Sequence, residues 1–284
     1  MAIQKFGKYE IIRPIGQGTA GTVYQAFDPI IDRCVALKII SGEHIEHPEF
    51  HQRFKKEVQA QGRVLHPNVA VIFDVNILNG KYVIVMEYVD GQSLREVIDE
   101  TGVFPLRLFF KVVSQICSGL WCAHCQGVVH RDIKPDNIFL CEKGAIKILD
   151  FSIAKIQSST TKTGMNFLLG SAHYMSPEQI LGEKVTPASD QFALGVLCVE
   201  LLTGRRPFEA ENIAESILNT TRQTAPAIHK LNPMVDSELN EIIQRSLMKD
   251  ASERFPTVAH MRKTLTEYFV KLDPSIQDIA YLDS

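Results

Sequence analysis

The sequence predicts an α+β fold in two lobes, an antiparallel sheet with one helix followed by a mainly helical lobe. Short β-branched runs separated by turn residues fill the chain up to Val89, and stretches with helical spacing predominate after Asp90-Gly91. A length of 284 residues suits one large or two modest domains. We therefore expect a first lobe over 9–89, a second lobe over 90–272 and a C-terminal tail over 273–284.

The first lobe is predicted to be a sheet that carries one helix. Between Tyr9 and Ile40, apolar and polar residues alternate between Gly and Asp-Pro turns, which indicates three strands. From Glu49 to Leu65 the apolar residues recur at helical spacing. Two further strands, Val69–Val75 and Lys81–Val89, are separated by Asn79-Gly80, a strong hairpin signal.

The second lobe is predicted to begin with a short helix that Ser93 caps and that ends at Glu100. A long apolar-rich helix follows over Leu106–Gln126. After a central region of strands and loops, further helices are expected over Pro187–Thr203, Asn212–Thr220, Ser237–Met248 and Thr257–Leu272. The residues from Asp273 onwards have no clear period and are expected to form a mobile tail.

The composition excludes some classes of protein. A formal net charge of -3 gives no reason to expect a nucleic-acid partner. The first ten residues lack the apolar stretch of a signal peptide, and the longest apolar run, Phe192–Val199, is too short to span a membrane. We expect a soluble cytoplasmic protein, with the cytosolic domain of a membrane-tethered parent as the alternative.

The six cysteines are scattered, and one pair has the spacing of a redox or metal site, Cys122-Ala-His-Cys125. The chain has no second C-x-x-C, and the surrounding segment is apolar. Small buried thiols are common on apolar helices. We therefore expect reduced, structural cysteines.

The segment His130-Arg-Asp-Ile-Lys-Pro-Asp-Asn137 concentrates charge within eight residues. A solvated polar turn is the alternative, but the apolar surroundings disfavour it. The segment resembles the catalytic loop of protein kinases. The resemblance implies that Asp132 orients and deprotonates a substrate hydroxyl, that Lys134 contacts the γ-phosphate, and that Asn137 binds Mg²⁺.

A glycine-rich segment, Gly16-Gln-Gly18-Thr-Ala-Gly21-Thr-Val23, matches G-x-G-x-x-G-x-V. A dinucleotide site is the rival interpretation, but it requires a helix after the glycines. Here Val23 to Phe27 has the pattern of a strand, so the glycines are predicted to lie in a hairpin. Such a hairpin lets backbone N–H groups approach phosphates closely.

The next strand ends in Val35-Ala-Leu-Lys38, which resembles the kinase V-A-I-K. The resemblance implies that Lys38 reaches the α- and β-phosphates and pairs with Glu57 on the following helix. Gln61 departs from the family, which usually has an apolar residue there, and this departure is expected to loosen the packing of that helix.

The segment from Val85 to Val89 resembles the hinge of the family. There the backbone of Glu87 and Val89 would hold adenine, and Met86 would line the back of the pocket. The residues implied in nucleotide binding are Ile15, Gly16, Gly18, Gly21, Val23, Ala36, Lys38, Met86, Glu87, Val89 and Phe139.

Asp150-Phe-Ser152 stands where the family has D-F-G, so the resemblance makes Asp150 the second Mg²⁺ ligand. Ser152 replaces a glycine and restricts positive φ, a change that we interpret as tuning. Between this point and Glu178 lies a loop rich in Ser and Thr. Its expected phosphorylation sites are Thr163 and then Thr161, with Arg131 as the phosphate-binding side chain.

Gly170 to Glu178 resembles the peptide-positioning end of the activation segment, with Ser-Pro-Glu in place of A-P-E. The resemblance pairs Glu178 with Arg254 and assigns Asp190 to anchoring the catalytic-loop backbone. It also places Ser171 against Lys134, and Lys134 itself is typical of Ser/Thr rather than Tyr kinases.

The resemblance covers Tyr9 to Leu272 and is strongest to bacterial Ser/Thr kinases of eukaryotic type. It implies the bilobal protein kinase fold, ATP with Mg²⁺ or alternatively Mn²⁺, and protein substrates with Ser or Thr acceptors. Autophosphorylation between the partners of a homodimer is a further expectation. A pseudokinase scaffold, suggested by Ser152 and Gln61, and a small-molecule phosphotransferase are the alternatives.

Overall fold

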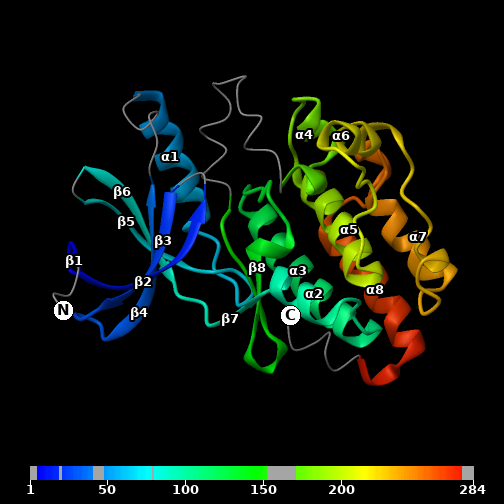
Figure 1. Cartoon of the computed structure of the whole chain (residues 1–284), viewed down its shortest axis with the longest axis horizontal. Coiled ribbons are helices and arrows are strands. Elements are labelled where there is room, and N and C mark those ends of the chain that lie inside the picture. Colours follow the sequence, from blue (N-terminus) through cyan, green and yellow to red (C-terminus); the bar gives the residue numbers. More distant parts are fainter. Residues whose placement is uncertain (1–4, 19–20, 41–47, 79, 152–170, 277–284) are drawn as a thin grey trace. The chain divides into compact units, whose positions relative to one another are not determined.

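A computed structural model describes residues 5–18, 21–40, 48–78, 80–151 and 171–276. The chain divides into two compact units, with a boundary between Asp90 and Gly91. The first unit is the predicted sheet with one helix, and the second is mainly helical (Figure 1). The predicted α+β fold class is therefore confirmed.

The first unit contains an antiparallel six-stranded sheet in the order β1-β2-β3-β4-β6-β5. Its helix α1 covers one face, where Phe54 and Val58 pack against Ile40 and Ile84 (Figure 1). The strands are β1 (Lys5–Phe6), β2 (Tyr9–Gly18), β3 (Gly21–Asp28), β4 (Arg33–Ile40), β5 (Ile72–Leu78) and β6 (Lys81–Glu87), and α1 spans Pro48–Gln61. The two-residue β1 was not predicted, because it is too short to show a period.

The second unit combines a three-stranded sheet, ordered β7-β8-β9, with a set of packed helices. Helix α5 runs through the middle of these helices (Figure 1) and is buried over nearly its whole length. The elements used below are β7 (Gly91–Ser93), α2 (Leu94–Thr101), α3 (Leu106–Cys125), β8 (Ile138–Cys141), β9 (Ile146–Ile148), η7 (Ser171–Tyr174), α4 (Pro177–Ile180), α5 (Pro187–Thr203), α6 (Ile213–Arg222), α7 (Ser237–Ser246) and α8 (Val258–Leu272).

The end of the chain differs from the prediction. Asp273 ends α8, and Pro274–Ile276 form the short 3₁₀ helix η10, in which the Ile276 side chain is buried. Burial of this apolar side chain stabilises the short helix. The predicted tail from Asp273 thus begins with a short 3₁₀ helix, its mobility stays a prediction, and 277–284 lie outside the described residues.

One helix in the described part of the chain has the length and apolar content of a membrane span, namely α3. Two thirds of its most apolar stretch is buried inside the second unit, as expected for a core helix. Lys111 and Gln115 interrupt its apolar residues, so the helix is less conspicuous in the sequence than the uninterrupted run Phe192–Val199.

Candidate active site

The segment from His130 to Asn137 connects α3 to β8, and its polar groups converge on Asp132. The Asn137 amide Nδ2 donates to the Asp132 backbone oxygen at 2.7 Å and to its carboxylate Oδ2 at 2.9 Å. The Lys134 Nζ lies 3.4 Å from the same Oδ2. Three residues that the sequence singled out are thus brought together, and the carboxylate is held by two donors.

His130 braces this loop through both ring nitrogens. Its Nδ1 lies 3.2 Å from the Asp132 N–H and its Nε2 lies 2.8 Å from the Leu149 carbonyl. A backbone N–H only donates and a carbonyl only accepts, so the ring is the neutral tautomer with its proton on Nε2. Burial lowers the pKa of His130 below its ordinary value, which keeps this tautomer in place.

Asp190, in the first turn of α5, anchors the loop from the other side. Its Oδ2 accepts from the His130 N–H and its Oδ1 from the Arg131 N–H, both at 2.8 Å. The His124 Nε2 donates to Oδ2 at 2.8 Å. Burial by itself raises the pKa of Asp190, but these hydrogen bonds outweigh burial and hold it below its ordinary value.

Arg131 has a strained backbone directly before Asp132. Its φ of 67° lies in the left-handed region, which costs a residue other than glycine about 1–3 kcal/mol. Such a conformation persists only where neighbouring groups hold it, and the hydrogen bond to Asp190 is one of them.

The donor set around Asn137 and Asp150 fits a hard divalent cation. Because the Asn137 Nδ2 is engaged by Asp132, the amide offers Oδ1 to a metal. Asp150 follows β9 and also has a positive φ, of 53°. An amide oxygen and a carboxylate are ligands that Mg²⁺ accepts, with substrate phosphates completing the coordination.

In the first unit, one face of the sheet carries several of the residues expected to bind nucleotide. Val23 lies opposite both Gly16 and Lys38, and Ala36 lies opposite Met86. Opposite residues on neighbouring strands point to the same face, as do residues two apart on one strand. These side chains therefore form one continuous set on this face.

Helix α1, which carries Glu57, packs on the same face of the sheet. Ile40 and Ile84 lie on the Lys38 side of the sheet, and both pack against α1 residues Phe54 and Val58, which flank Glu57. Lys38 is 9% exposed, so its ammonium is largely removed from water. The ion pair between Lys38 and Glu57 stays a prediction.

The structure gives a reason for glycine at position 21, one of the three glycines of the motif. Its φ is 140°, and a Cβ added there would lie 1.9 Å from the Ile39 carbonyl oxygen. Only glycine fits such a contact with a backbone atom. The glycine is required by packing of β3 on β4, a reason that the sequence motif did not indicate.

The remaining nucleotide-binding candidates are placed as follows. The Glu87 N–H donates to the Val71 carbonyl at 2.9 Å, and the contact of the Glu87 backbone with adenine stays a prediction. Ile15 is exposed on β2, Val89 is half-buried after β6, and Phe139 is half-buried on β8 in the second unit.

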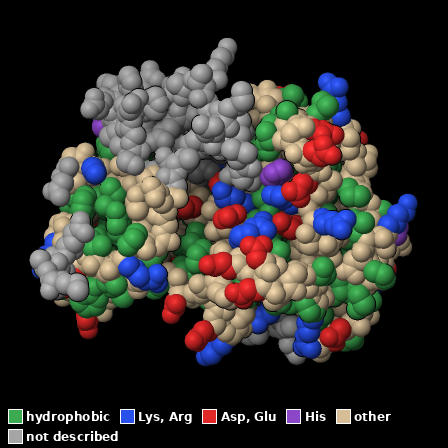
Figure 2. Space-filling model, viewed as in Figure 1, with side chains coloured by type: hydrophobic (Ala, Val, Ile, Leu, Met, Phe, Trp, Pro, Cys, Tyr) green, Lys and Arg blue, Asp and Glu red, His purple; other side chains and the backbone are tan. Residues whose placement is uncertain are grey.

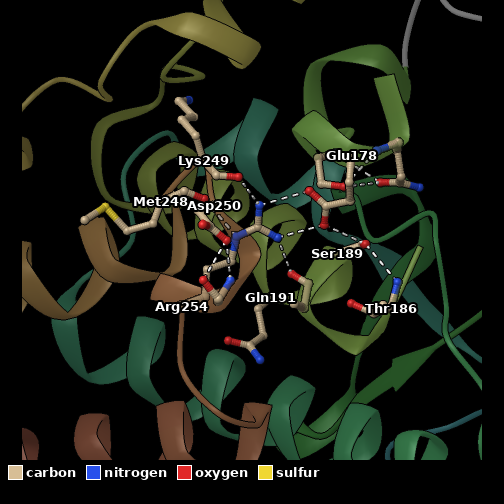
Figure 3. Close-up of polar contacts among 12 residues, drawn as sticks. Glu178, Thr186, Ser189, Gln191, Met248, Lys249, Asp250 and Arg254 are labelled. Atoms are coloured by element: carbon tan, nitrogen blue, oxygen red, sulfur yellow. Dashed lines mark hydrogen bonds and ion pairs between the residues drawn. The ribbon is translucent and has the colours of Figure 1, made fainter. Parts of the chain in front are cut away.

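Glu178 and Arg254 form a buried clamp in the second unit (Figure 3). The guanidinium Nη1 and Nη2 lie 2.8 and 3.0 Å from the two carboxylate oxygens. The other Arg254 donors bond the carbonyl oxygens of Met248, Lys249 and Ala188. All five guanidinium donors are thus satisfied, which is what a fully buried arginine requires.

The protein kinase domain family matches residues 9–268. The chain belongs to the protein kinase family. It is 40% identical over 263 residues to the serine/threonine-protein kinase PrkC of Bacillus subtilis. The matched region covers 93% of this chain and 41% of that protein. It is 34% identical over 252 residues to PknD of Mycobacterium tuberculosis, covering 88% of this chain and 38% of that protein.

The PknI kinase domain of M. tuberculosis has the same fold, with a TM-score of 0.75, 25% identity, and coverage of 94% of this chain and 98% of that one. The expected bilobal kinase fold and the resemblance to bacterial Ser/Thr kinases are confirmed. This chain spans about two fifths of the length of its curated relatives. Protein kinases in general use ATP and a divalent metal ion.

This kinase-family chain has a further buried polar group that the sequence analysis missed. The Tyr174 hydroxyl donates to Glu200, and the Arg95 Nη2 donates to Tyr174 at 2.7 Å and to Glu200 at 2.9 Å. Burial, and then the Glu200 carboxylate, raise the pKa of Tyr174 well above its ordinary value. Together these residues join η7, α5 and α2. Their sequence separation gives no local signal.

Some predicted features of this kinase fall where the structure gives no account. Ser152, Thr161 and Thr163 lie outside the described residues, as does the side chain of Ser171. Gln61 is buried, and its Oε1 has no hydrogen-bond partner among the described residues. All six cysteines lie within the described residues, and none of them forms a disulfide.

Acid is expected to destabilise the second unit through Glu178 and Asp190. Burial raises the pKa of Glu178, but hydrogen bonds from Arg254 and Ser189 outweigh it and hold that pKa below 4.5. A lowered pKa in the folded state gives stability that is present above the unfolded-state pKa and lost as pH falls through the folded-state pKa. The urea concentration at the midpoint of unfolding should therefore decrease as the pH is lowered below about 4.5.

The matched variant for this measurement is Glu178→Gln, which cannot titrate. It should be less stable at pH 7 and should lose less further stability between pH 4.5 and 3 than the unmodified chain. An equally steep decline in both proteins would contradict the assignment to Glu178.

Proposed function

We propose that this chain is a Ser/Thr protein kinase that transfers the γ-phosphoryl group of ATP to Ser or Thr hydroxyls of protein substrates. The observation that carries the proposal is the fixed carboxylate of Asp132. Its Oδ2 receives the Asn137 amide at 2.9 Å and the Lys134 ammonium at 3.4 Å. We assign this carboxylate as the group that accepts the hydroxyl proton of the substrate.

Electrostatic positioning supplies most of the catalysis in this class of reaction. Lys134 would lie beside the transferred phosphoryl group, and Lys38, held by Glu57, would bind the α- and β-phosphates. Asn137 and Asp150 would hold Mg²⁺, with Mn²⁺ as an alternative, and the bound cation would neutralise phosphate charge. Adenine would contact the backbone of Glu87 and Val89, with Met86 at the back of the pocket.

Protein rather than nucleic acid is the proposed substrate. On the face drawn in Figure 2, Lys and Arg side chains of the second unit lie among Asp and Glu side chains. Arg95 and Arg206 each have a carboxylate partner, Glu200 and Glu209. Interspersed charges of both signs suit a peptide better than a phosphate backbone.

Regulation and location are also proposed. Phosphorylation of Thr163, or next of Thr161, would supply an anion for Arg131, and it would arise in trans within a transient homodimer. Six cysteines that form no disulfide and the need for ATP support a cytoplasmic site of action. Mass spectrometry of active protein tests the two threonines, and a chain that is active while both are unmodified would contradict this regulation.

The test of the activity is a labelling assay with ATP, Mg²⁺ and a generic protein substrate. The chain should label Ser and Thr, and Asp132→Asn should reduce kcat by at least about 100-fold, because the general base is lost. Label on protein that does not depend on Asp132, or its complete absence, would favour the pseudokinase alternative. Label on a small molecule in place of protein would favour a small-molecule phosphotransferase.

A further inference from the structure

The peptide of Arg131 is held from both sides. Its N–H donates to the Asp190 Oδ1 at 2.8 Å, and its carbonyl oxygen accepts from the Gln179 Nε2 at 2.9 Å. Arg131 is the residue with a φ of 67° that directly precedes Asp132. A left-handed residue relaxes unless its peptide groups are held, so both contacts bear on where the Asp132 carboxylate points.

The oxygen of the same Gln179 amide contacts Ser176, which lies in the part of the chain predicted to end the activation segment. Its Oε1 accepts from the Ser176 N–H at 3.0 Å and from the Ser176 Oγ at 3.2 Å. Two donors face Oε1 and a carbonyl faces Nε2, so the orientation of the amide is fixed. One side chain therefore joins the segment that precedes α4 to the catalytic loop.

We propose that Gln179 is a positioning residue for phosphoryl transfer. It holds the strained Arg131 peptide by its carbonyl, keeps Asp132 in place, and couples that placement to the segment containing Ser176. The inference rests on the proposed kinase activity. The simpler view is that Gln179 only caps α4, since Ser176 and Gln179 form a capping box.

Gln179→Glu separates the two views. Glutamate has the same size and keeps the oxygen that caps α4, but a carboxylate has no N–H to donate to the Arg131 carbonyl. Gln179→Ala loses both contacts. If Gln179 positions Asp132, kcat should fall about 10-fold in both variants, with the KM values for ATP and for protein within twofold of the unmodified chain. The thermal midpoint should fall further in Gln179→Ala, which loses the cap of α4 as well.

Three outcomes would overturn the proposal. Normal kcat in Gln179→Glu with a loss in Gln179→Ala would leave Gln179 as a helix cap only. Normal kcat in both would leave it without a role in turnover. A rise in the KM for protein alone would place its effect on substrate binding. Failure of the unmodified chain to label protein would instead reject the kinase activity, which is a different result.

Combining Gln179→Glu with Arg131→Gly tests whether Gln179 acts through the Arg131 peptide. Glycine adopts a positive φ without strain, so in Arg131→Gly the peptide needs no clamp, and adding Gln179→Glu should lower kcat by less than twofold. The same 10-fold loss in both backgrounds would contradict action through Arg131. If Arg131→Gly abolishes turnover, the comparison of Gln179→Glu with Gln179→Ala decides alone.

Discussion

Replacing Asp190 by asparagine is expected to destabilise the second unit by about 3–5 kcal/mol and to remove most phosphotransfer. The Asp190 carboxylate is fully buried and accepts from His124 and from the N–H groups of His130 and Arg131. Asparagine keeps one oxygen but turns an amide N–H toward donors. Each lost hydrogen bond to a buried charge is worth about 1.5–3 kcal/mol.

Denaturant unfolding followed by a kinase assay measures both effects. The matched control is Asp99→Asn, the same chemical change at a carboxylate whose side chain is 65% exposed and 3.5 Å from Arg95. That variant should stay within about 0.5 kcal/mol of the unmodified chain. Comparable losses in the two variants would show that the anchoring contacts of Asp190 contribute little.

Arg254→Met is expected to be as damaging, with a loss of about 3–5 kcal/mol, because it leaves Glu178 charged and buried without its partner. The same change removes the donors for three carbonyl oxygens, those of Met248, Lys249 and Ala188. Methionine fills much of the volume of arginine, so the loss reflects charge and hydrogen bonding more than a cavity.

Arg222→Met provides the control, since Arg222 is exposed at the end of α6, and it should change stability by less than about 1 kcal/mol. Differential scanning calorimetry of both variants at pH 7 gives the comparison. A thermal midpoint for Arg254→Met near that of Arg222→Met would contradict the clamp.

Helix boundaries were predictable wherever capping chemistry was local. Helix α5 begins and ends where predicted because Thr186 and Pro187 begin it and Gly204, with a φ of 68°, ends it. Ser93 caps α2 in a capping box with Glu96, as its position suggested. Asn212 was assigned to a helix but is its N-cap, an error of one residue that periodicity alone does not resolve.

Within the candidate site, contacts among neighbouring motif residues were predictable from the sequence, and contacts between distant residues were not. Asp132, Lys134 and Asn137 lie within six residues, so their motif carries most of the information about how they meet. Contacts such as the one between Arg95 and Glu200, 105 residues apart, depend on the packing of several helices. The contact of Gln179 with the Arg131 carbonyl shows the same limit, because backbone acceptors leave no trace in sequence.

The burial of α5 has a consequence for how the segment from His130 to Asn137 tolerates substitution. Asp190 belongs to a helix that is buried over nearly its whole length. It accepts hydrogen bonds from backbone N–H groups, which every amino acid except proline provides. These two hydrogen bonds therefore do not depend on the side chains of His130 and Arg131. The side chains around the loop can therefore change while the backbone directly before Asp132 keeps its anchor in the protein interior.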